Sequence, residues 1–277
     1  MTHYSILVNT CDKFEDCWNP FFILFSKYWN DCKAKIYLNT EYKDYSFTGI
    51  DISPIKGCEG KNIPIGKYAT WSQCLKWALD KIDSELVLYM QEDYFIKSKV
   101  DNLIVEKYVE FMNVHKDVMC IHLTDQGMVP SSKYYGQDLY IADQTQKYYV
   151  SCQAAIWRKE ELYKIIRERE TAWEFEKLGS MRAKAYKGIY LAIDRSKVVL
   201  NKSEIIPYIF TGIVKGKWIK EVPELFERNN IYIDYSKRGF WNRSVHKPLQ
   251  LRLKHFITTI PNLFYNYFET LLIKYWL

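Results

Sequence analysis

Two adjacent carboxylates, Glu92 and Asp93, directly follow the short apolar run Leu86–Met90. A run of this kind is typical of a strand that is buried on both faces of a sheet. In an open α/β sheet, ligands bind beyond the carboxyl ends of the strands. Acid groups there can hold a divalent cation through oxygen ligands, and the cation can bind a diphosphate. The alternative is a surface turn with a solvated acidic pair, and the strand leaves both interpretations open.

A second acidic motif is Trp173-Glu174-Phe175-Glu176. Acids two positions apart diverge on a helix, so only one of them is expected to face a pocket. A carboxylate beside aromatic rings can have a raised proton affinity and act as a general base toward an alcohol. A helix start whose acids favour the helix dipole is the alternative, and the motif alone favours that alternative.

A third candidate is Asp12, which follows Thr10 and Cys11 at the end of the first predicted strand. Its carboxylate could accept hydrogen bonds from a base ring or a ribose hydroxyl, but it could equally cap the following helix. The chain has no phosphate-binding glycine loop and no serine or cysteine in a nucleophile motif, which lowers the case for kinases, NTPases, dehydrogenases and hydrolases.

The elements that must position these residues alternate between strand and helix. An amphipathic helical spacing covers Phe14–Trp29, Tyr68–Ile82, Val105–His115 and Lys159–Glu168. Strands are predicted at Tyr4–Asn9, Ala34–Leu38, Phe47–Ile52, Val118–Leu123, Tyr148–Trp157, Tyr190–Ile193 and Lys197–Leu200, with an irregular polar loop over Gln126–Gln146. The order predicts an α/β fold with a mostly parallel central sheet flanked by helices.

Composition narrows the class further. At 277 residues and 48% hydrophobic content, the chain can bury a substantial core. Seven scattered cysteines without a CxxC pair argue against a disulfide framework or a zinc site and favour a reducing compartment. The amino terminus lacks a secretory signal, and no apolar run is long enough to span a bilayer, so we expect a cytoplasmic protein.

Several motifs together resemble the bacterial GT-A-type glycosyltransferases of surface polysaccharide (capsule and O-antigen) synthesis. The donor-side likeness lies in Thr10-Cys11-Asp12-Lys13-Phe14, Trp71-Ser72 and Gln91-Glu92-Asp93-Tyr94-Phe95. Val150–Trp157 and Trp173–Glu176 resemble that group's acceptor-side strand and base-bearing helix. Gly212–Trp218 and Arg238-Gly239 resemble its closing segment. The likeness covers Tyr4 to Trp241, so we expect a GT-A-like catalytic domain over residues 1–241.

The resemblance implies a nucleotide-sugar donor, most simply a UDP-sugar, and a hydroxyl of a glycan or lipid-linked glycan as acceptor. It implies a divalent cation, Mn²⁺ or Mg²⁺, held by Asp93. It also implies inverting transfer with Glu176 as base, and Glu174 as the alternative. Because the usual Asp-x-Asp pattern is absent, basic side chains could instead stabilise the diphosphate. The donor contacts implied are Thr10, Asp12, Trp71, Glu92, Asp93, Lys215, Lys217 and Arg238, and the acceptor contacts are Gln153 and Trp173.

The carboxyl-terminal residues 242–277 are expected to form basic amphipathic helices, divided at Pro261. The whole net charge of +6 lies within residues 237–277. Basic residues mixed with Trp, Tyr and Leu favour a helix in the interface of an anionic membrane, at the inner face of the plasma membrane. Packing on the catalytic domain or a dimer contact is the alternative. Nucleic acid is not an expected partner, because the basic residues lie in an apolar tail.

Two rival functions remain open at this stage. A nucleotidyltransferase could use a similar sheet, but it would need a glycine-rich phosphate loop near the first strand. A non-catalytic carbohydrate-binding or scaffold protein of the same pathway would tolerate loss of the acidic residues.

Overall fold

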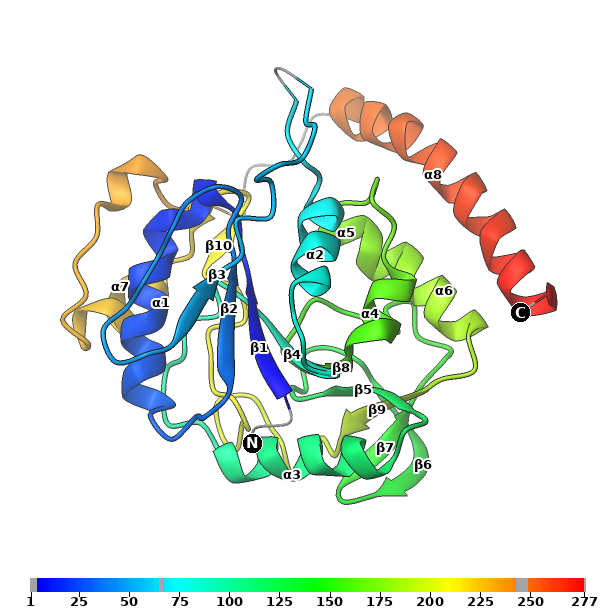
Figure 1. Cartoon of the computed structure of the whole chain (residues 1–277), viewed down its shortest axis with the longest axis horizontal. Coiled ribbons are helices and arrows are strands. Elements are labelled where there is room, and N and C mark those ends of the chain that lie inside the picture. The colour runs from blue at the N-terminus through cyan, green and yellow to red at the C-terminus, as the bar shows by residue number, and fades with distance from the viewer. Residues whose placement is uncertain (1–3, 65–66, 243–248, 277) are drawn as a thin grey trace.

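The computed structural model describes residues 4–64, 67–242 and 249–276, with the side chains of its last helix described over residues 261–275. The described residues form a nine-stranded sheet in the order β3-β2-β1-β4-β8-β5-β9-β7-β6. Helices cover both faces (Figure 1), which confirms the predicted α/β class. The strands are β1 (Tyr4–Asn9), β2 (Lys35–Asn39), β3 (Ile52–Pro54), β4 (Leu86–Gln91), β5 (Val118–His122), β6 (Pro130–Gly136), β7 (Leu139–Ala142), β8 (Ala155–Arg158) and β9 (Ile189–Ile193).

The register of the central strands brings several strand ends to one edge of the sheet. β1 is parallel to β2 and to β4, with Asn9 opposite both Asn39 and Gln91. β8 runs antiparallel between β4 and β5, and Ala155 at its start lies opposite Tyr89 and His122. The carboxyl ends of β1, β2, β4 and β5 therefore meet the beginning of β8 at the same edge, which we call the acidic edge.

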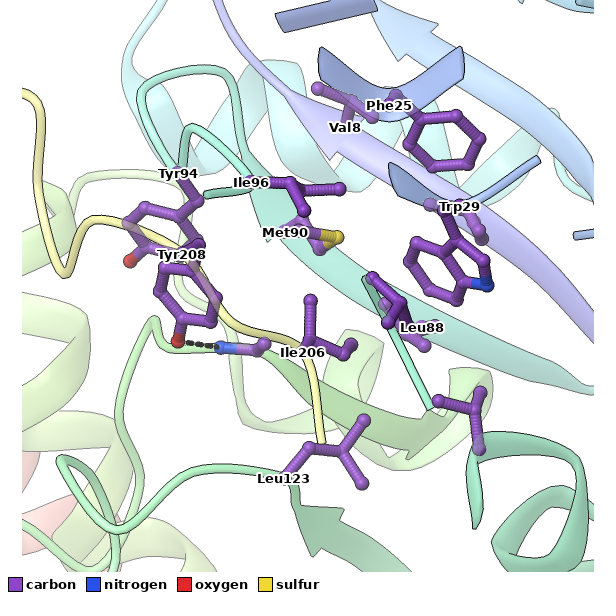
Figure 2. Packing of buried hydrophobic residues seen from close by; sticks show 14 of the residues in the cluster. Val8, Phe25, Trp29, Leu88, Met90, Tyr94, Ile96, Leu123, Ile206 and Tyr208 are labelled. Atoms are coloured by element: carbon purple, nitrogen blue, oxygen red, sulfur yellow. Dashed lines mark hydrogen bonds between the residues drawn. The ribbon is translucent and has the colours of Figure 1, made fainter. Parts of the chain in front are cut away.

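The central strands are buried on both faces because alternate residues belong to different hydrophobic clusters. Val8 and Leu88 point into one cluster, whereas Leu7 and Val87 point into the other. Figure 2 shows part of the first cluster, in which Met90 of β4 lies between Phe25 and Trp29, on the side of α1 (Glu15–Tyr28), and the stacked rings of Tyr94 and Tyr208. The first cluster is covered by α1, α3 (Asn102–Val114) and α7 (Val222–Glu227), and the second by α2 (Trp71–Asp80), α4 (Lys159–Ile165) and α6 (Ser180–Ala185).

Four local predictions are wrong. The strand expected at Phe47–Ile52 is a turn closed by an isolated bridge between Phe47 and Ile50, and β3 begins only at Ile52. The segment expected as an irregular loop over Gln126–Gln146 contains the β6–β7 hairpin, whose turn residues Gln137 and Asp138 both have positive φ, 56° and 65°. Turns with positive φ at both central residues usually contain glycine there, and neither position of this turn is glycine. The hairpin could therefore not be recognised from the turn sequence. Lys197–Leu200 is not a strand, and within Tyr148–Trp157 only the end joins β8, because Val150–Ala154 crosses the acidic edge without strand pairing.

The expected break at Pro261 is also wrong, because α8 (Leu249–Trp276) is one continuous helix. Figure 1 shows it running along the side of the molecule that carries α5 (Ala172–Glu174) and α6. Among its described side chains, over residues 261–275, Asn266 and Ile273 are buried. None of the described helices is long and apolar enough to cross a membrane.

A buried ionic network fixes α8 to the domain. Arg182 of α6 donates to both oxygens of Glu170, at 2.8 and 2.6 Å, and its guanidinium also donates to Asn266. All three side chains are fully buried, and an unpaired charge at such a site would cost several kcal/mol. A second ion pair joins Arg167 to Glu269 near the same interface. The helix is therefore attached to the domain by specific polar contacts as well as by apolar packing.

Candidate active site

The first wall of the acidic edge is formed by reciprocal hydrogen bonds between Asp12, which follows β1, and Glu41, which follows β2; we call this pair the bracket. The Asp12 carboxylate accepts hydrogen bonds from the backbone N–H groups of Glu41, Tyr42 and Lys43, at 2.9, 3.0 and 3.2 Å. In return, the Asp12 N–H donates to Glu41 Oε2 at 3.0 Å. The described partners of the Asp12 carboxylate are thus backbone groups, and its contact with a donor base stays a prediction.

Thr10 has a similar position inside the fold. Its hydroxyl accepts a 2.8 Å hydrogen bond from Trp18 Nε1 and donates to the carbonyl of Cys11. Because Thr10 is buried, its side chain fixes the turn that leaves β1. Its expected donor contact also stays a prediction.

The second wall is the acidic pair at the end of β4. Asp93 Oδ2 accepts hydrogen bonds from Thr211 Oγ1 at 2.8 Å and from the Ile213 N–H at 3.0 Å. The Gly212 N–H donates to the Asp93 carbonyl at 3.0 Å. A Cβ at Gly212 would lie 2.4 Å from the Phe95 ring, so only glycine allows this approach. Asp93 therefore holds a segment that is more than a hundred residues away in the sequence.

Both carboxylates of the pair are buried, and burial raises the pKa of each. The negative charge of Asp93 raises the pKa of Glu92 further, and Arg238 lowers it by a smaller amount. The hydrogen bonds from Thr211 and Ile213 partly offset the effect of burial on Asp93. Two like charges are therefore held close together at a site with few compensating partners.

The donor set of this pair fits the implied divalent cation. Asp93 Oδ1 is buried and has no hydrogen-bond partner among the described residues. Within the same described part of the chain, the hydrogen bonds and ion pairs found include none from another residue to the Glu92 carboxylate. Oxygen ligands suit Mg²⁺ and Mn²⁺. Because the described residues place no third ligand of this kind beside the pair, the other positions would fall to water or to substrate oxygens.

The structure distinguishes the two acids of the Trp173–Glu176 motif. Glu174 closes α5 (Ala172–Glu174) in a capping box, where its Oε2 accepts from the N–H and the hydroxyl of Thr171, each at 3.0 Å. Its Oε1 accepts from Asn262 of α8 at 3.1 Å. Glu174 therefore stabilises the helix start, as the alternative interpretation of the motif proposed.

Glu176 instead faces the acidic edge. It lies in a single π-helical turn, Phe175–Gly179, a feature that often occurs at functional sites. Its Oε1 accepts a 2.8 Å hydrogen bond from the Cys152 N–H, whereas burial raises the pKa of its carboxyl. Its Oε2 accepts no hydrogen bond from the described residues. Glu176 is thus a partly exposed carboxylate with one oxygen available.

Tyr89 of β4 lies close enough to both acidic groups for their charges to affect its hydroxyl. Its hydroxyl is buried, and burial raises its pKa well above the usual value, with further increases from the charges of Glu92 and Glu176. The Tyr94 hydroxyl donates to the Cys152 carbonyl at 2.8 Å, which fixes Cys152 beside the end of β4. The acidic pair and Glu176 are therefore brought to one region of the sheet edge by β4 and the segment before β8.

The expected acceptor residues occupy different environments. Trp173 is 80% exposed beside Glu174, and its ring is free to contact a glycan. Gln153 is buried, and its Oε1 accepts from the Tyr208 hydroxyl at 2.9 Å. Trp71, expected on the donor side, packs against Phe175 with ring centroids 5.5 Å apart. The structure shows a packing partner for Trp71 and for Gln153, and their substrate contacts stay predictions.

The basic candidates lie on the closing segment. Lys215 and Lys217 are exposed on a small hairpin formed by β10 (Ile213–Val214) and β11 (Lys217–Trp218). Positive φ at Lys215 and Gly216, 53° and 77°, makes the tight two-residue turn. Arg238 pairs with Asp16 through two nitrogens, at 2.6 Å for Nε, and covers the Phe14 ring at 4.5 Å. Arg238 therefore attaches the closing segment to the turn after β1.

Three residues of this arrangement were not singled out from the sequence. Glu41 follows the end of β2, and an acid at a strand end is a signal that could have found it. Thr211 and Cys152 act through contacts with Asp93 and Glu176, from which they are distant in sequence, and no local pattern marks them.

No protein-family model matches the chain, and no curated protein matches it. Among solved structures, residues 1–349 of S. aureus TarS align with 85% of this chain and 68% of that chain, at 15% identity and a TM-score of 0.46. Another TarS structure aligns at 12% identity and 0.46, over 85% of this chain and 41% of that one. Glucosyl-3-phosphoglycerate synthase from Mycobacterium tuberculosis, in complex with Mn²⁺ and UDP-glucose, aligns at 8% identity and 0.37, over 83% and 80%. Because these similarities are low, the functional proposal depends on the residues of this chain.

The buried acidic pair generates a prediction about stability. The pKa of Glu92 is higher in the folded than in the unfolded chain, so its destabilising effect grows as the pH rises through the unfolded value of about 4.3. We expect Glu92→Gln to raise the free energy of unfolding by about 1–3 kcal/mol at pH 7 and by much less at pH 4. Urea unfolding at both pH values measures this.

Glu227→Gln, on the exposed side of α7, is the matched control and should leave stability within about 0.5 kcal/mol. A loss of stability in Glu92→Gln at pH 7 would contradict the destabilising role assigned to the Glu92 charge.

Proposed function

We propose that this protein is a glycosyltransferase that moves a sugar from a nucleoside diphosphate sugar to a hydroxyl group of a glycan. The observation that carries the proposal is that two kinds of acidic group lie at the same edge of the sheet. The buried pair Glu92-Asp93 follows β4, and the available carboxylate Glu176 is joined to the same edge through Cys152. A carboxylate pair that can hold a cation and a separate carboxylate that can act as base suit such a transfer.

On the donor side, Asp93 Oδ1 and the Glu92 carboxylate would hold Mn²⁺ or Mg²⁺. A bound cation would neutralise the two like charges and bind the diphosphate oxygens. The turn after β1 and the bracket of Asp12 with Glu41 would receive the nucleoside, for which a UDP-sugar is the proposed donor. Lys215 and Lys217 are exposed on their hairpin and would approach the diphosphate from the closing segment.

On the acceptor side, Glu176 would take the proton of the acceptor hydroxyl on Oε2. The hydroxyl oxygen then bonds to the anomeric carbon as the bond from that carbon to the diphosphate oxygen breaks, and the nucleoside diphosphate leaves with the electron pair. Attack from the face opposite the leaving group gives inversion. The Cys152 N–H orients the carboxylate through Oε1, and Trp173 offers an exposed face for the sugar ring.

We further propose that α8 places this site at an anionic membrane, where a lipid-linked glycan of surface polysaccharide synthesis would be presented. Over its described residues 261–275, α8 exposes six large apolar side chains, which we call the α8 aromatic face: Phe264, Tyr265, Tyr267, Phe268, Leu272 and Tyr275. Aromatic side chains of this kind favour the membrane interface, and the adjacent basic residues of the sequence favour anionic lipid. Because Asn262 of α8 bonds to Glu174, a bound α8 would hold the base-bearing motif close to the lipid.

The direct test of the function is donor binding. Purified protein should bind one UDP-sugar of a panel with saturation, more weakly by about tenfold or more in EDTA than with Mn²⁺, as calorimetry measures. Asp93→Asn should abolish the difference between the two conditions, because it removes the ligand charge. If donor binding is unchanged by EDTA, the diphosphate is held by the basic residues and not by a cation. If no donor binds, the scaffold function is favoured.

The proposed base generates a kinetic prediction. Glu176→Gln should lower kcat by about 10²–10⁴-fold without unfolding the protein, whereas Glu174→Gln should lose less than about tenfold. The base must be ionised, and burial raises the pKa of Glu176 above the ordinary carboxyl value of 4.5. As the pH is lowered, wild-type kcat should therefore begin to fall at a pH higher than an ordinary glutamate would give. Steady-state rates between pH 5 and 9 measure both effects. Near-normal turnover of Glu176→Gln would refute its role.

The membrane proposal predicts binding of the purified protein to vesicles that contain phosphatidylglycerol. Phe264→Ser combined with Phe268→Ser should weaken co-sedimentation by about tenfold or more, since each removes a side chain worth about 1.5–3 kcal/mol on burial. Leu103→Ser with Val114→Ser, two exposed apolar residues of α3, is the matched control and should bind as wild type does. Unchanged vesicle binding, or self-association through this face in sedimentation velocity, would contradict the proposal.

A further inference from the structure

A second group of potential metal ligands lies near the acidic edge, and it contains sulfur. Glu41, Cys58 and Cys74 come from three different segments, and their ligand atoms lie within 4.8 Å of one another. Glu41 follows β2, Cys58 follows β3, and Cys74 lies in the first turns of α2. Among the described residues, this is the one group of three or more such ligands that meets this spacing.

Backbone contacts hold the three segments in this arrangement. The Cys58 N–H donates to the Glu41 carbonyl at 3.0 Å, and the Gly57 N–H donates to the Thr40 carbonyl at 2.9 Å. The start of α2 is fixed by a capping box between Thr70 and Gln73, one residue before Cys74. The positions of the ligands therefore do not depend on a metal, so the site is assembled before an ion arrives.

The donor set selects the chemical class of the ion. Two sulfurs and one carboxylate oxygen suit zinc, which takes thiolate, imidazole and carboxylate ligands in a tetrahedral site. Hard cations such as Mg²⁺ prefer oxygen alone. Around zinc, two sulfurs at about 2.3 Å each lie about 3.8 Å apart. The limit of 4.8 Å on the distances between the ligand atoms of this group is compatible with that geometry.

Burial of ordinary core cysteines explains only part of this arrangement. Cys58 and Cys74 are buried, at 2% and 7% exposure, as core thiols often are. Glu41 is partly exposed and lies within ligand distance of both sulfurs, which apolar packing alone does not require. The exposed side of Glu41 also leaves access for a water molecule as fourth ligand.

We propose that Glu41, Cys58 and Cys74 form a zinc site, with water at the fourth position, that fastens the segment between β3 and α2 to the end of β2. The site is separate from the oxygen site at Glu92-Asp93 and does not depend on the proposed transferase activity. The site would also be linked to Asp12, because Glu41 Oε2 accepts a hydrogen bond from the Asp12 N–H. Zinc would therefore stiffen the turns on which the nucleoside is proposed to lie.

The test uses the reduced full-length chain, stripped of metal, with zinc chloride and cobalt chloride as probes. We expect one zinc per chain in competition with a chromophoric chelator, and a rise in unfolding temperature of at least about 4 °C at saturating zinc. Cobalt should give the intense near-ultraviolet absorption of thiolate ligation and the visible bands of a tetrahedral ion.

Cys58→Ser and Cys74→Ser should each weaken zinc binding at least tenfold and remove the thiolate absorption, and Glu41→Gln should weaken binding while retaining that absorption. Cys32→Ser, a partly exposed cysteine outside the group, is the matched control and should bind as wild type does. The wild-type cobalt spectrum tests the site even where a variant fails to fold. Absence of thiolate absorption in wild type, its persistence in the Cys58→Ser, Cys74→Ser double variant, or the finding that Cys58 and Cys74 form a disulfide in place of metal binding would overturn the proposal.

Discussion

The burial of Glu92 and Asp93 side by side is the constraint on which the rest of this edge depends. Two carboxylates in a protein interior are costly unless donors or a cation compensate them. The chain supplies donors to one of the four oxygens by returning Thr211 and Ile213 to Asp93. Further pairings continue this path, because Ile209 bonds to Phe95 and Lys97 bonds to Pro207. The course of the closing segment over the end of β4 is thus fixed by the same group that is proposed to hold the cation.

The inverted direction of β8 has a comparable effect on the other side of the site. Because β8 runs against β4 and β5, the residues before it cross the acidic edge and bring Cys152 to Glu176. The base-bearing motif is joined to α8 through the bond from Asn262 to Glu174, and α8 is joined to the domain through Arg182. A chain of contacts therefore connects the proposed membrane face with the proposed base.

The acidic edge combines two ligand sets of opposite character. The carboxylates at the end of β4 are hard ligands that suit Mg²⁺ or Mn²⁺, whereas the thiols beside the end of β2 are soft ligands that Mg²⁺ binds poorly. Glu41 takes part in the second set while its carboxylate also accepts the Asp12 N–H. The bracket between β1 and β2 is therefore where a structural ion and a bound nucleoside would influence each other.

The sequence by itself determined the parts of this protein that depend on local pattern. The apolar runs of β1 and β4 must be buried on both faces, so their position in the sheet and the placement of Glu92-Asp93 at its edge could be predicted. The helix over Tyr68–Ile82 followed from its spacing in the same way. Only the tertiary structure decided which acid of Trp173–Glu176 faces the site, since Glu174 is occupied by Thr171 and Asn262. It also decided that Asp12 bonds to the backbone after β2, and that α8 continues through Pro261. In the cases of Glu174 and Asp12, the deciding contacts include partners tens of residues away, and no local pattern of residues encodes such a contact.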